Sequence, residues 1–469
     1  MASRFNKISL GKLQKLGLAD IQTGPFGTVL KASEFSDFGV PVISTGEIRE
    51  GFVQLSQRTP FVSEEITNRL PQFVLELDDI VFGRKGAIDR NAIIKGNQVG
   101  WFLGSDGIRL RLSKDINSAF VSYQLRLDAI GKWLLQNSTG STMPSLNQKI
   151  LDRLPLWLPP ICIQDGIASI LSSIDAKIEV NNKINAELEA MAKLIYDYWF
   201  VQFDFPFDFA QGKPDPKGEP YKSSGGKMVY NKELRREIPE GWEVNPFAAW
   251  IKNDKSGDWG KETEQGNYIK QVSCIRGADL NGLNGKGDVK SPTRFILEKN
   301  SHKLLDIGDF IIEISGGSPT QSTGRMAFIT RETLERFDNP LICSNFCKAV
   351  TLKEEKAIYN FAYEWNRLYD AGVLFGWEGK TSGIKNLLFE SFVSNHKVVI
   401  PDSIIMEHFY DKAKPIHAQM QTNLKQNQKL SELRDWLLPM LMNGQVTVGE
   451  AKQEFGMVAE ENATKYGKN

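Results

Sequence analysis

Two long stretches of the chain carry apolar residues at the mixed three- and four-residue spacing that marks one face of a helix. The first runs from about Ile163 to Phe200 and the second from about Ile404 to Met442. Apolar positions at this spacing line one side of an α-helix, so each stretch predicts a helix far longer than the usual three turns. A long helix with one narrow apolar stripe needs a partner, and we expect the two to pack together.

Each predicted helix carries two asparagines near its apolar stripe. Asn181 and Asn185 in the first helix correspond to Asn423 and Asn427 in the second. A polar residue inside such a stripe can set the register of paired helices, whereas an asparagine on its flank would be solvated. The pattern leaves both interpretations open.

The remainder of each half predicts a mixed module of short strands and a helix. Runs of β-branched and aromatic residues, such as Pro41–Ile43 and Asp79–Phe82, are bounded by Gly, Asp and Asn turns. Helical stretches are expected at Phe120–Ile130 in the first module and at Ala357–Tyr369 in the second. The predicted fold class is therefore α+β, with two mixed α/β modules.

Comparison of the sequence with itself shows three blocks that match in one order. The spacing between matched positions grows from 227 to 242 residues along the chain. The blocks pair Gly39–Arg49 with Gly266–Arg276, Gly140–Thr142 with Gly379–Thr381, and Ile174–Ile195 with Ile416–Leu437. Three ordered blocks with drifting spacing indicate a duplicated domain that has acquired insertions in its loops.

The repeat predicts six segments. They are a first module at residues 1–160, a first helix at 161–203, a connector at 204–240, a second module at 241–402, a second helix at 403–442 and a C-terminal tail at 443–469. Within the connector, the segment Gln211–Gly226 is rich in Gly, Pro, Lys and Ser, which predicts a loop. The aromatic run Tyr196–Phe207 is expected to be a hydrophobic joint, and a stacking platform for nucleic acid is the alternative.

Composition narrows the class of protein. The 469 residues are 41% hydrophobic and 24% charged, as in a globular chain of two to four domains. There is no apolar run of about 18 residues, no signal peptide, and only four scattered cysteines, so we expect a cytoplasmic protein without a membrane partner. Lys and Arg together number 57, as do Asp and Glu, so net charge does not indicate a nucleic-acid partner.

Signatures of metal binding and catalysis are incomplete. The pair Cys343-x-x-x-Cys347 has no second pair at the spacing of a zinc site. The segment Gly379–Thr381 resembles the end of a phosphate-binding loop, but Leu374 stands where that loop needs a glycine. Asp338–Leu341 is only half of the tetrapeptide of amino-methyltransferases. We therefore expect no catalytic residues, no metal and no cofactor in this chain.

The order of module, long helix, module and long helix resembles the specificity subunit of a type I restriction-modification system. The resemblance covers essentially the whole chain. Its most specific portions are Leu158–Gln164, Leu194–Phe203, Tyr221–Tyr230 and Ile238–Glu243. One departure is Met406, which stands where the second helix would repeat Gln164.

This resemblance implies two target-recognition domains separated by an antiparallel helical pair, each recognising one half of an asymmetric site in double-stranded DNA. It also implies that catalysis belongs to partner chains: two modification subunits that use S-adenosylmethionine to methylate adenine, and restriction subunits that use ATP and Mg to translocate and cut DNA. The neutral charge favours an alternative, a two-domain scaffold that joins protein partners without binding DNA. An enzyme with its own methylation chemistry is a further alternative, which the incomplete motifs oppose.

Loops on a rigid scaffold are suitable places for side chains that contact base edges and phosphates. We expect such contacts from charged and polar side chains in loops at corresponding places in the two modules. The candidates are Arg84, Lys85, Arg90, Thr139 and Ser141 in the first module, Gln321, Arg325, Lys380 and Ser382 in the second, and the matched pair Arg49 and Arg276. For each of them the alternative is a structural or solvated side chain.

Overall fold

The structure is a computed structural model that describes residues 6–140, 142–316, 318, 320–381 and 384–460. It divides into two compact units, one of Met1–Ile178 with Gln428–Asn469 and one of Glu179–Asn427. Each unit contains one module and part of both long helices. The mixture of helices and sheets confirms the α+β fold class.

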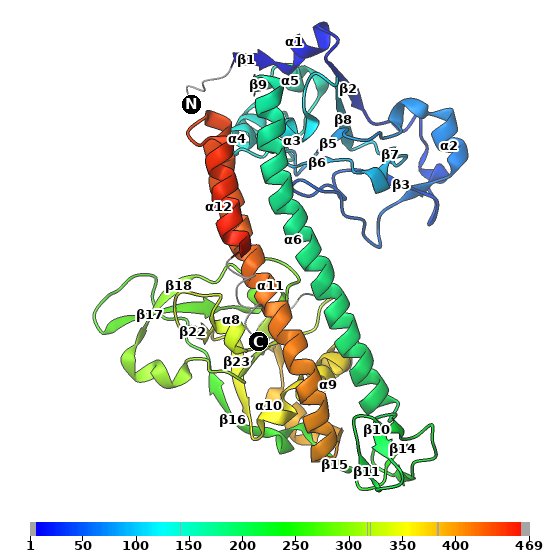
Figure 1. Cartoon of the computed structure of the whole chain (residues 1–469), viewed down its shortest axis with the longest axis vertical. Coiled ribbons are helices and arrows are strands. Elements are labelled where there is room, and N and C mark those ends of the chain that lie inside the picture. Colours follow the sequence, from blue (N-terminus) through cyan, green and yellow to red (C-terminus); the bar gives the residue numbers. More distant parts are fainter. Residues whose placement is uncertain (1–5, 141, 317, 319, 382–383, 461–469) are drawn as a thin grey trace. The chain divides into compact units, whose positions relative to one another are not determined.

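The first unit is built around a four-stranded antiparallel sheet with the order β2-β8-β5-β6 (Figure 1). Its strands are β2 (Ala19–Thr23), β5 (Ile80–Gly83), β6 (Asn91–Ile93) and β8 (Gly107–Leu112). Ile80 and Phe82 belong to a core that includes residues of α3 (Ser118–Leu125) and α6 (Ile161–Tyr196), whereas Val81 belongs to a second core. Successive side chains of a strand point to opposite faces, so β5 is buried on both sides.

Smaller elements complete the first unit. A three-stranded sheet has the order β4-β3-β7, and a separate antiparallel pair joins β1 to β9. These strands are β1 (Asn6–Ser9), β3 (Val40–Ile43), β4 (Phe61–Val62), β7 (Phe102–Leu103) and β9 (Pro155–Leu158), and the helices are α1 (Leu10–Lys15), α2 (Glu64–Arg69), α4 (Asp128–Asn137), α5 (Gln148–Leu151) and α12 (Val448–Glu460). The single helix predicted at Phe120–Ile130 is wrong: α3 and α4 are separate, because the chain turns at Arg126 and Leu127.

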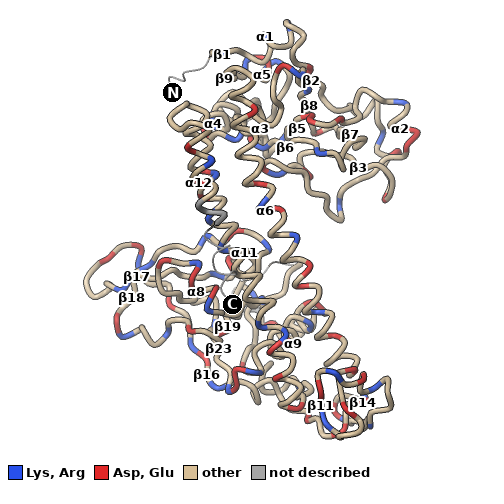
Figure 2. The backbone as a smooth tube through the Cα atoms, in the orientation of Figure 1, with Lys and Arg blue, Asp and Glu red and all other residues tan. Residues whose placement is uncertain are grey.

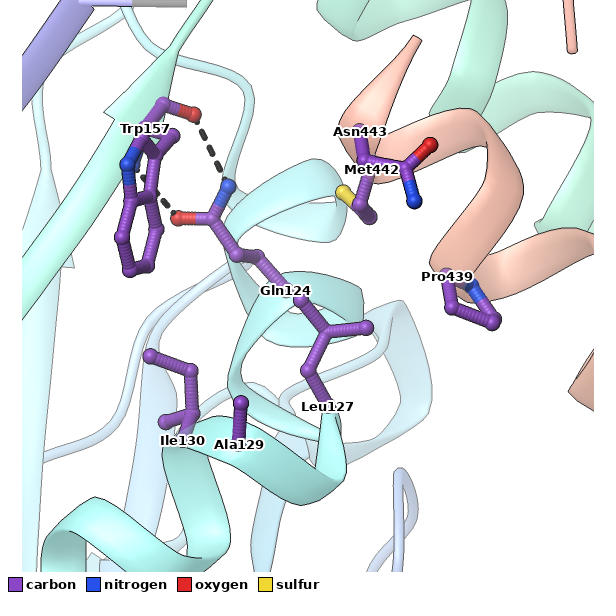
Figure 3. Close-up of a pocket in the computed structure, with 8 residues that line it drawn as sticks. All are labelled: Gln124, Leu127, Ala129, Ile130, Trp157, Pro439, Met442 and Asn443. Carbon is purple, nitrogen blue, oxygen red and sulfur yellow. Dashed lines mark hydrogen bonds between the residues drawn. The ribbon is translucent and has the colours of Figure 1, made fainter. Parts of the chain in front are cut away.

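One side-chain amide fastens α3 to the edge of β9. Gln124 donates from Nε2 to the Trp157 carbonyl oxygen at 2.8 Å, and its Oε1 accepts from the Trp157 N–H at 2.9 Å (Figure 3). A pocket of about 20 Å³ lies beside this contact, against Pro439 and Met442 near the end of α11 (Ser403–Asn443). That volume holds about one water molecule, so the pocket is too small to be a ligand site.

The second unit repeats the topology of the first. Its main sheet has the order β16-β23-β19-β21, and its three-stranded sheet, β18-β17-β22, again has one antiparallel and one parallel neighbour. The strands are β16 (Ile251–Ser256), β17 (Tyr268–Ile275), β18 (Thr293–Leu297), β19 (Phe310–Glu313), β21 (Met326–Phe328), β22 (Leu341–Cys343) and β23 (Cys347–Leu352). Phe310 and Ile312 face one core and Ile311 faces another, as in β5. The duplication predicted from the sequence is confirmed at the level of topology.

Further elements of the second unit follow the same plan. A pair of strands, β15 and β26, corresponds to β1 and β9, and a small sheet has the order β20-β25-β24. The strands are β15 (Glu243–Pro246), β20 (Ser315–Gly316), β24 (Glu378–Thr381), β25 (Ile384–Leu387) and β26 (Lys397–Ile400), and the helices are α7 (Leu280–Leu283), α8 (Arg331–Leu334), α9 (Ile358–Asp370) and α10 (Phe389–Asn395).

The connector contains short paired strands, two of which lie within Gln211–Gly226, so the segment predicted as a loop is mostly turn but not entirely. It contains β10 (Pro206–Asp208), β11 (Lys213–Pro214), β12 (Glu219–Pro220), β13 (Met228–Asn231) and β14 (Arg236–Pro239). Phe205 stacks on Tyr221 at 4.6 Å and on Trp242 at 5.0 Å between ring centroids. The aromatic side chains give these short strands a core that composition did not reveal. Tyr196 and Trp199 are buried in the same core, which supports the hydrophobic joint.

The structure corrects one block of the internal alignment. Ile43 at the end of β3 lies opposite Leu103 in a parallel pair, just as Ile275 at the end of β17 lies opposite Cys343. Ile275 therefore corresponds to Ile43, and the match of Arg49 with Arg276 is wrong. Short β-branched runs match at several registers, and only strand pairing distinguishes between them.

The two long helices run antiparallel where they meet. Within the second unit, Ala192 of α6 packs with Ile416 and Met420 of α11. Within the first unit, Asp175 of α6 accepts from the Arg434 guanidinium of α11 at 3.0 Å. Residue numbers rise along one helix as they fall along the other, so the pair is antiparallel. A π-helical turn, Asp197–Val201, ends the first helix.

Buried amides join the two helices in the second unit. Asn181 donates from Nδ2 to Gln426 Oε1 and to Asn427 Oδ1, both at 2.8 Å. Asn423 donates from Nδ2 to Asn185 Oδ1, also at 2.8 Å. Because Asn181 corresponds to Asn423 and Asn185 to Asn427, the same contact is made in both directions. These buried amides support the register interpretation and exclude a solvated flank.

We expect Asn423→Ala to lower the free energy of unfolding by about 1–3 kcal/mol, because the Asn185 Oδ1 would stay buried without its donor. The measurement is the midpoint of urea unfolding of the full chain. Gln428→Ala is the matched control on α11, since its side chain makes only an exposed hydrogen bond with Glu432, and its midpoint should hardly change. Equal midpoints for the two variants would contradict the structural role of the amide layer.

Candidate nucleic-acid interface

Several loops of the first module meet at one edge of its main sheet. Because neighbouring strands alternate in direction, β2 and β5 end at the edge where β8 begins. The segment that follows β5 is hydrogen-bonded on both sides. The Arg84 N–H donates to the Asp106 carbonyl oxygen at 2.8 Å, and the Arg84 carbonyl oxygen accepts from the Leu146 N–H at 2.8 Å. We call these loops the first loop cluster, residues 24–27, 83–90, 105–106 and 139–146.

The hydroxyl-rich loop belongs to this cluster. Thr139 and Ser145 exchange two backbone hydrogen bonds of 3.0 and 2.7 Å, and the Gly86 N–H donates to the Pro144 carbonyl oxygen at 2.9 Å. The structure thus brings Thr139 close to the Arg84–Gly86 turn, although more than 50 residues separate them in the sequence. Ser141 lies outside the described residues.

The cations of the first loop cluster are largely available to a ligand. The Arg84 guanidinium lies 5.0 Å from the ring centroid of Phe26 and donates from Nη1 to the Ser105 carbonyl oxygen at 3.1 Å. No described carboxylate pairs with it. Lys85 is half exposed and lies 3.3 Å from an Asp106 carboxylate oxygen. Arg90 is exposed, and no described residue bonds to its side chain. An arginine held in place without a carboxylate partner suits contact with a base edge or a phosphate.

Sequence reasoning missed the aromatic residue beneath Arg84. Phe26 lies in the segment Gly24–Gly27 that follows β2, and its side chain is 57% exposed. Gly24 is required here because a Cβ at this position would collide with the Gly104 carbonyl oxygen.

The same motif follows the equivalent strand of the second module. Gly257–Gly260 comes directly after β16, and a Cβ on Gly257 would collide with the Ser344 carbonyl oxygen. Its aromatic residue, Trp259, has the Arg294 guanidinium 4.1 Å from its ring centroid. The recurrence of Gly-x-aromatic-Gly in both halves was the signal by which the sequence could have indicated Phe26.

The second module forms an equivalent loop cluster. The Ile314 N–H donates to the Phe346 carbonyl oxygen at 2.9 Å, and the Ile314 carbonyl oxygen accepts from the Leu387 N–H at 2.8 Å. These are the bonds that Arg84 makes in the first module, so Ile314 occupies the place of Arg84. We call residues 314–325, 345–346 and 375–387, where described, the second loop cluster. The two clusters are equivalent in position but differ in chemistry.

Arg325 is committed to an internal ion pair. Its guanidinium donates to both carboxylate oxygens of Glu313, from Nε at 2.9 Å and from Nη2 at 2.6 Å, and the bond to Glu313 raises the pKa of Arg325. The Glu313 side chain is buried. Arg325 precedes β21 as Arg90 precedes β6, but Gly83 stands where β19 has Glu313 and leaves Arg90 unpaired.

The remaining predicted residues are divided between turns and the second loop cluster. Arg276 donates to the Asp279 carboxylate from Nε at 2.8 Å and from Nη2 at 3.0 Å, and Arg49 donates from Nη1 to the Gly46 carbonyl oxygen at 2.7 Å. Both arginines close the turns that follow β17 and β3, and neither belongs to a loop cluster. Gln321 closes a tight turn with Ser318 through two backbone bonds.

Two predicted residues of the second module lie partly or wholly outside the described residues. Lys380 lies in β24, paired with Lys385, and its side chain is outside the description, as is Ser382. Contact with DNA is untested for every predicted residue and stays a prediction. The geometry favours Arg84, Lys85, Arg90, Thr139 and Gln321 over the paired arginines.

Nothing in the described part of the chain forms a metal site or a membrane span. No group of three or more His, Cys, Asp or Glu side chains there could hold a metal ion, and no helix among those residues is long and apolar enough to cross a membrane. Cys343 and Cys347 lie in buried strands, and burial raises the pKa of the Cys347 thiol to about 12.

Basic and acidic positions are interspersed along both modules, as Figure 2 shows. This agrees with the equal numbers of basic and acidic residues in the sequence. Any attraction for DNA therefore depends on local clusters such as Arg84, Lys85 and Arg90, and not on a field from the whole protein.

Comparison with known proteins gives consistent results. Residues 16–190 match the model of the family described as type I restriction modification DNA specificity domain. The chain is 26% identical over 463 residues to the type I restriction enzyme MjaIX specificity subunit of Methanocaldococcus jannaschii, covering 96% of this chain and 98% of the relative. It is 21% identical over 338 residues to the HindI specificity subunit of Haemophilus influenzae, covering 67% and 73%.

The fold also matches a solved structure. The crystal structure of the type I restriction-modification S subunit from M. genitalium superposes with a TM-score of 0.56 at 15% identity, covering 94% of this chain and 96% of that one. The two modules and the long helices of this chain thus have the same fold as that structure. Residues 16–190 match the DNA specificity domain of type I restriction-modification systems, and nearly the whole chain is similar to a specificity subunit, which confirms the resemblance seen in its motifs.

Two arginines should give opposite results when replaced by alanine. Arg84→Ala should weaken DNA binding by the chain assembled with a modification subunit by ~1–3 kcal/mol if the contact is bidentate to a guanine, and it should leave stability unchanged. Arg325→Ala should instead lower the free energy of unfolding by about 3–5 kcal/mol, because Glu313 would remain buried without its partner. Gel-shift titration and urea unfolding measure the two effects. If the Arg84→Ala complex bound every tested DNA as tightly as the unsubstituted complex does, Arg84 would be a structural or solvated side chain and not a DNA contact.

Proposed function

We propose that this chain selects the DNA target of a type I restriction-modification enzyme by recognising two unlike half-sites separated by a spacer of fixed length. The observation that carries this proposal is the pair of loop clusters. Each cluster lies at the corresponding edge of the main sheet of its own module. The first cluster has Arg84 and Lys85 at the positions where the second has Ile314 and Ser315. Equivalent positions with different chemistry fit the recognition of different base pairs by a common scaffold.

Catalysis in this proposal belongs to partner subunits. The modification subunits, in two copies, would methylate adenine with S-adenosylmethionine, and the restriction subunits would use ATP and Mg to translocate and cut DNA. An exposed apolar stripe on α6, formed by Val180, Ile184, Met191 and Leu194, supports docking of a modification subunit on the helices. Exposed apolar residues in a row on one helix face are typical of a site for a partner helix.

The second candidate function is a scaffold that joins proteins without binding DNA, and the neutral net charge favours it. A gel-shift assay separates the two functions, with the chain tested alone and after co-expression with a modification subunit. The proposed function requires a sequence-dependent shift in the assembled complex. A complex that assembles but shifts no DNA would support the scaffold.

The isolated chain should have no methyltransferase, nuclease or ATPase activity, because the sequence signatures of these activities are incomplete or absent. The measurement is methyl transfer from labelled S-adenosylmethionine to DNA by the pure chain, with the co-expressed assembly as positive control. Methyl transfer by the pure chain would contradict the assignment of catalysis to a partner.

Lengthening both helices should lengthen the spacer and leave the half-sites unchanged. The insertions, about two turns or ~seven residues each, would follow Ile178 in α6 and Asn427 in α11, where the helices pass from one unit to the other. Seven residues add about 10 Å, so the spacer should grow by at most about three base pairs. Mapping of methylated adenines in cells that express the variant measures both quantities. An unchanged spacer, or altered half-site bases, would show that the helices do not set the spacing.

A further inference from the structure

The two loop clusters differ most in what they leave exposed. In the first, Arg84 and Arg90 have no carboxylate partner among the described residues, and Lys85 has only a half-exposed one. Arginine and lysine make their most frequent specific contacts with the O6 and N7 atoms of guanine. The chemistry of this cluster therefore suits a G·C base pair.

The described cations of the second cluster are neutralised within the module. Arg325 is bound to Glu313, and Lys385 lies 3.1 Å from a Glu378 carboxylate oxygen and 5.0 Å from the ring centroid of Phe375. A cation that already has a buried carboxylate partner would have to break that ion pair before it could bind a base. This cluster therefore lacks the unpaired arginines of the first, although the Lys380 side chain lies outside the description.

Both clusters expose a Phe side chain, but Phe26 of the first lies beside the Arg84 guanidinium, whereas no cation of the described residues lies over the ring of Phe346 in the second. Phe346, at the position of Asp106 in the first module, is 54% exposed, and Ile384 is 48% exposed. The Phe346 carbonyl oxygen accepts hydrogen bonds from the Ile314 and Ser315 N–H groups, which fixes this residue beside the loop. Ile384 lies in β25, which pairs with β20 (Ser315–Gly316) in the small sheet of this module. Single exposed apolar side chains are normal on a protein surface, but apolar side chains grouped beside polar ones such as Gln321 are typical of a ligand site.

We propose that the second module recognises thymine through its 5-methyl group, with Phe346 as the principal contact, and that its half-site is the one richer in A·T pairs. In the major groove the thymine methyl is the apolar feature that a Phe side chain can contact, and glutamine pairs with adenine. This inference rests on the proposed function, because it assigns base chemistry to the same loop clusters.

The test uses the chain assembled with its modification subunit and a duplex containing the mapped target site. Each thymine is replaced in turn by deoxyuridine, which removes only the 5-methyl group. One contacted methyl group should change the dissociation constant about fourfold. We expect this loss at one or more thymines of the half-site that is insensitive to Arg84→Ala, and no loss at thymines of the other half-site.

A double-substitution comparison assigns the contact to Phe346. The Phe346→Ser substitution should weaken binding of the thymine duplex to the level at which the unsubstituted complex binds the deoxyuridine duplex. The Phe346→Ser complex should therefore bind the two duplexes with equal affinity. Ile307→Ser is the matched control, because Ile307 is 54% exposed in the same module but precedes β19, at the opposite edge of the sheet. This control should keep the full preference for thymine.

The possible outcomes distinguish a failure of the thymine inference from a failure of the proposed function on which it rests. Sequence-specific binding that is insensitive to deoxyuridine in both half-sites, or sensitive only in the half-site of Arg84, overturns the thymine inference and leaves the proposed function standing. A Phe346→Ser complex that still discriminates thymine from deoxyuridine also overturns it. An assembled complex that shows no preference for the mapped site overturns the proposed function itself.

Discussion

The architecture of each module depends on a central strand that is buried on both faces. In β5, Ile80 and Phe82 face one core while Val81 faces the other, and β19 has the same arrangement. Burial on two faces restricts both sides of the strand to apolar residues. Only the loops at the strand ends remain free to change, and antiparallel pairing places the loops after β2 and β5 and before β6 and β8 at the same edge. The scaffold therefore separates the residues that maintain the fold from those that can meet a ligand.

Each module buries one aspartate before its central strand, and the cation that balances its charge differs between the modules. Asp79 and Asp309 are each buried immediately before the central strand, and each accepts a backbone N–H from the residue three positions earlier. The charge of Asp79 is balanced by Arg111, at 2.7 and 2.8 Å, whereas that of Asp309 is balanced by Lys255 at 2.9 Å. These cations lie on non-equivalent strands, β8 and β16. Both modules thus neutralise the buried aspartate, but they do so with cations from different strands.

The sequence predicted the elements that follow from the periodicity of apolar residues. It missed the contacts that form only between segments far apart in the sequence. Both long helices were predicted within a few residues, because apolar residues recur at helical spacing along α6 and α11. The face that packs on the partner helix was not predicted throughout, since Ile184 and Met191 of the expected stripe are exposed and Asn181 and Asn185 are buried. The positions of the loop clusters followed from the repeat. The partner of Arg325 did not, because Glu313 lies on the neighbouring strand and no local pattern joins the two. The fold of the connector was missed for a similar reason: Phe205, Tyr221 and Trp242 form its core only after the chain has turned back on itself.

The contrast between Arg90 and Arg325 shows how a duplicated scaffold can acquire a second specificity. Both arginines precede the equivalent edge strand, but Glu313 holds Arg325 in the protein, and Gly83 offers Arg90 no partner. At the end of the central strand, a Cβ on Gly83 would collide with the Ala87 carbonyl oxygen, whereas the second module has room there for the Glu313 side chain that binds Arg325. The exposed surface then depends on neighbours such as Phe346 and Asp106, which vary without touching either core. The cations that each module offers to a ligand therefore depend as much on which of them are paired inside the module as on which side chains lie on its surface.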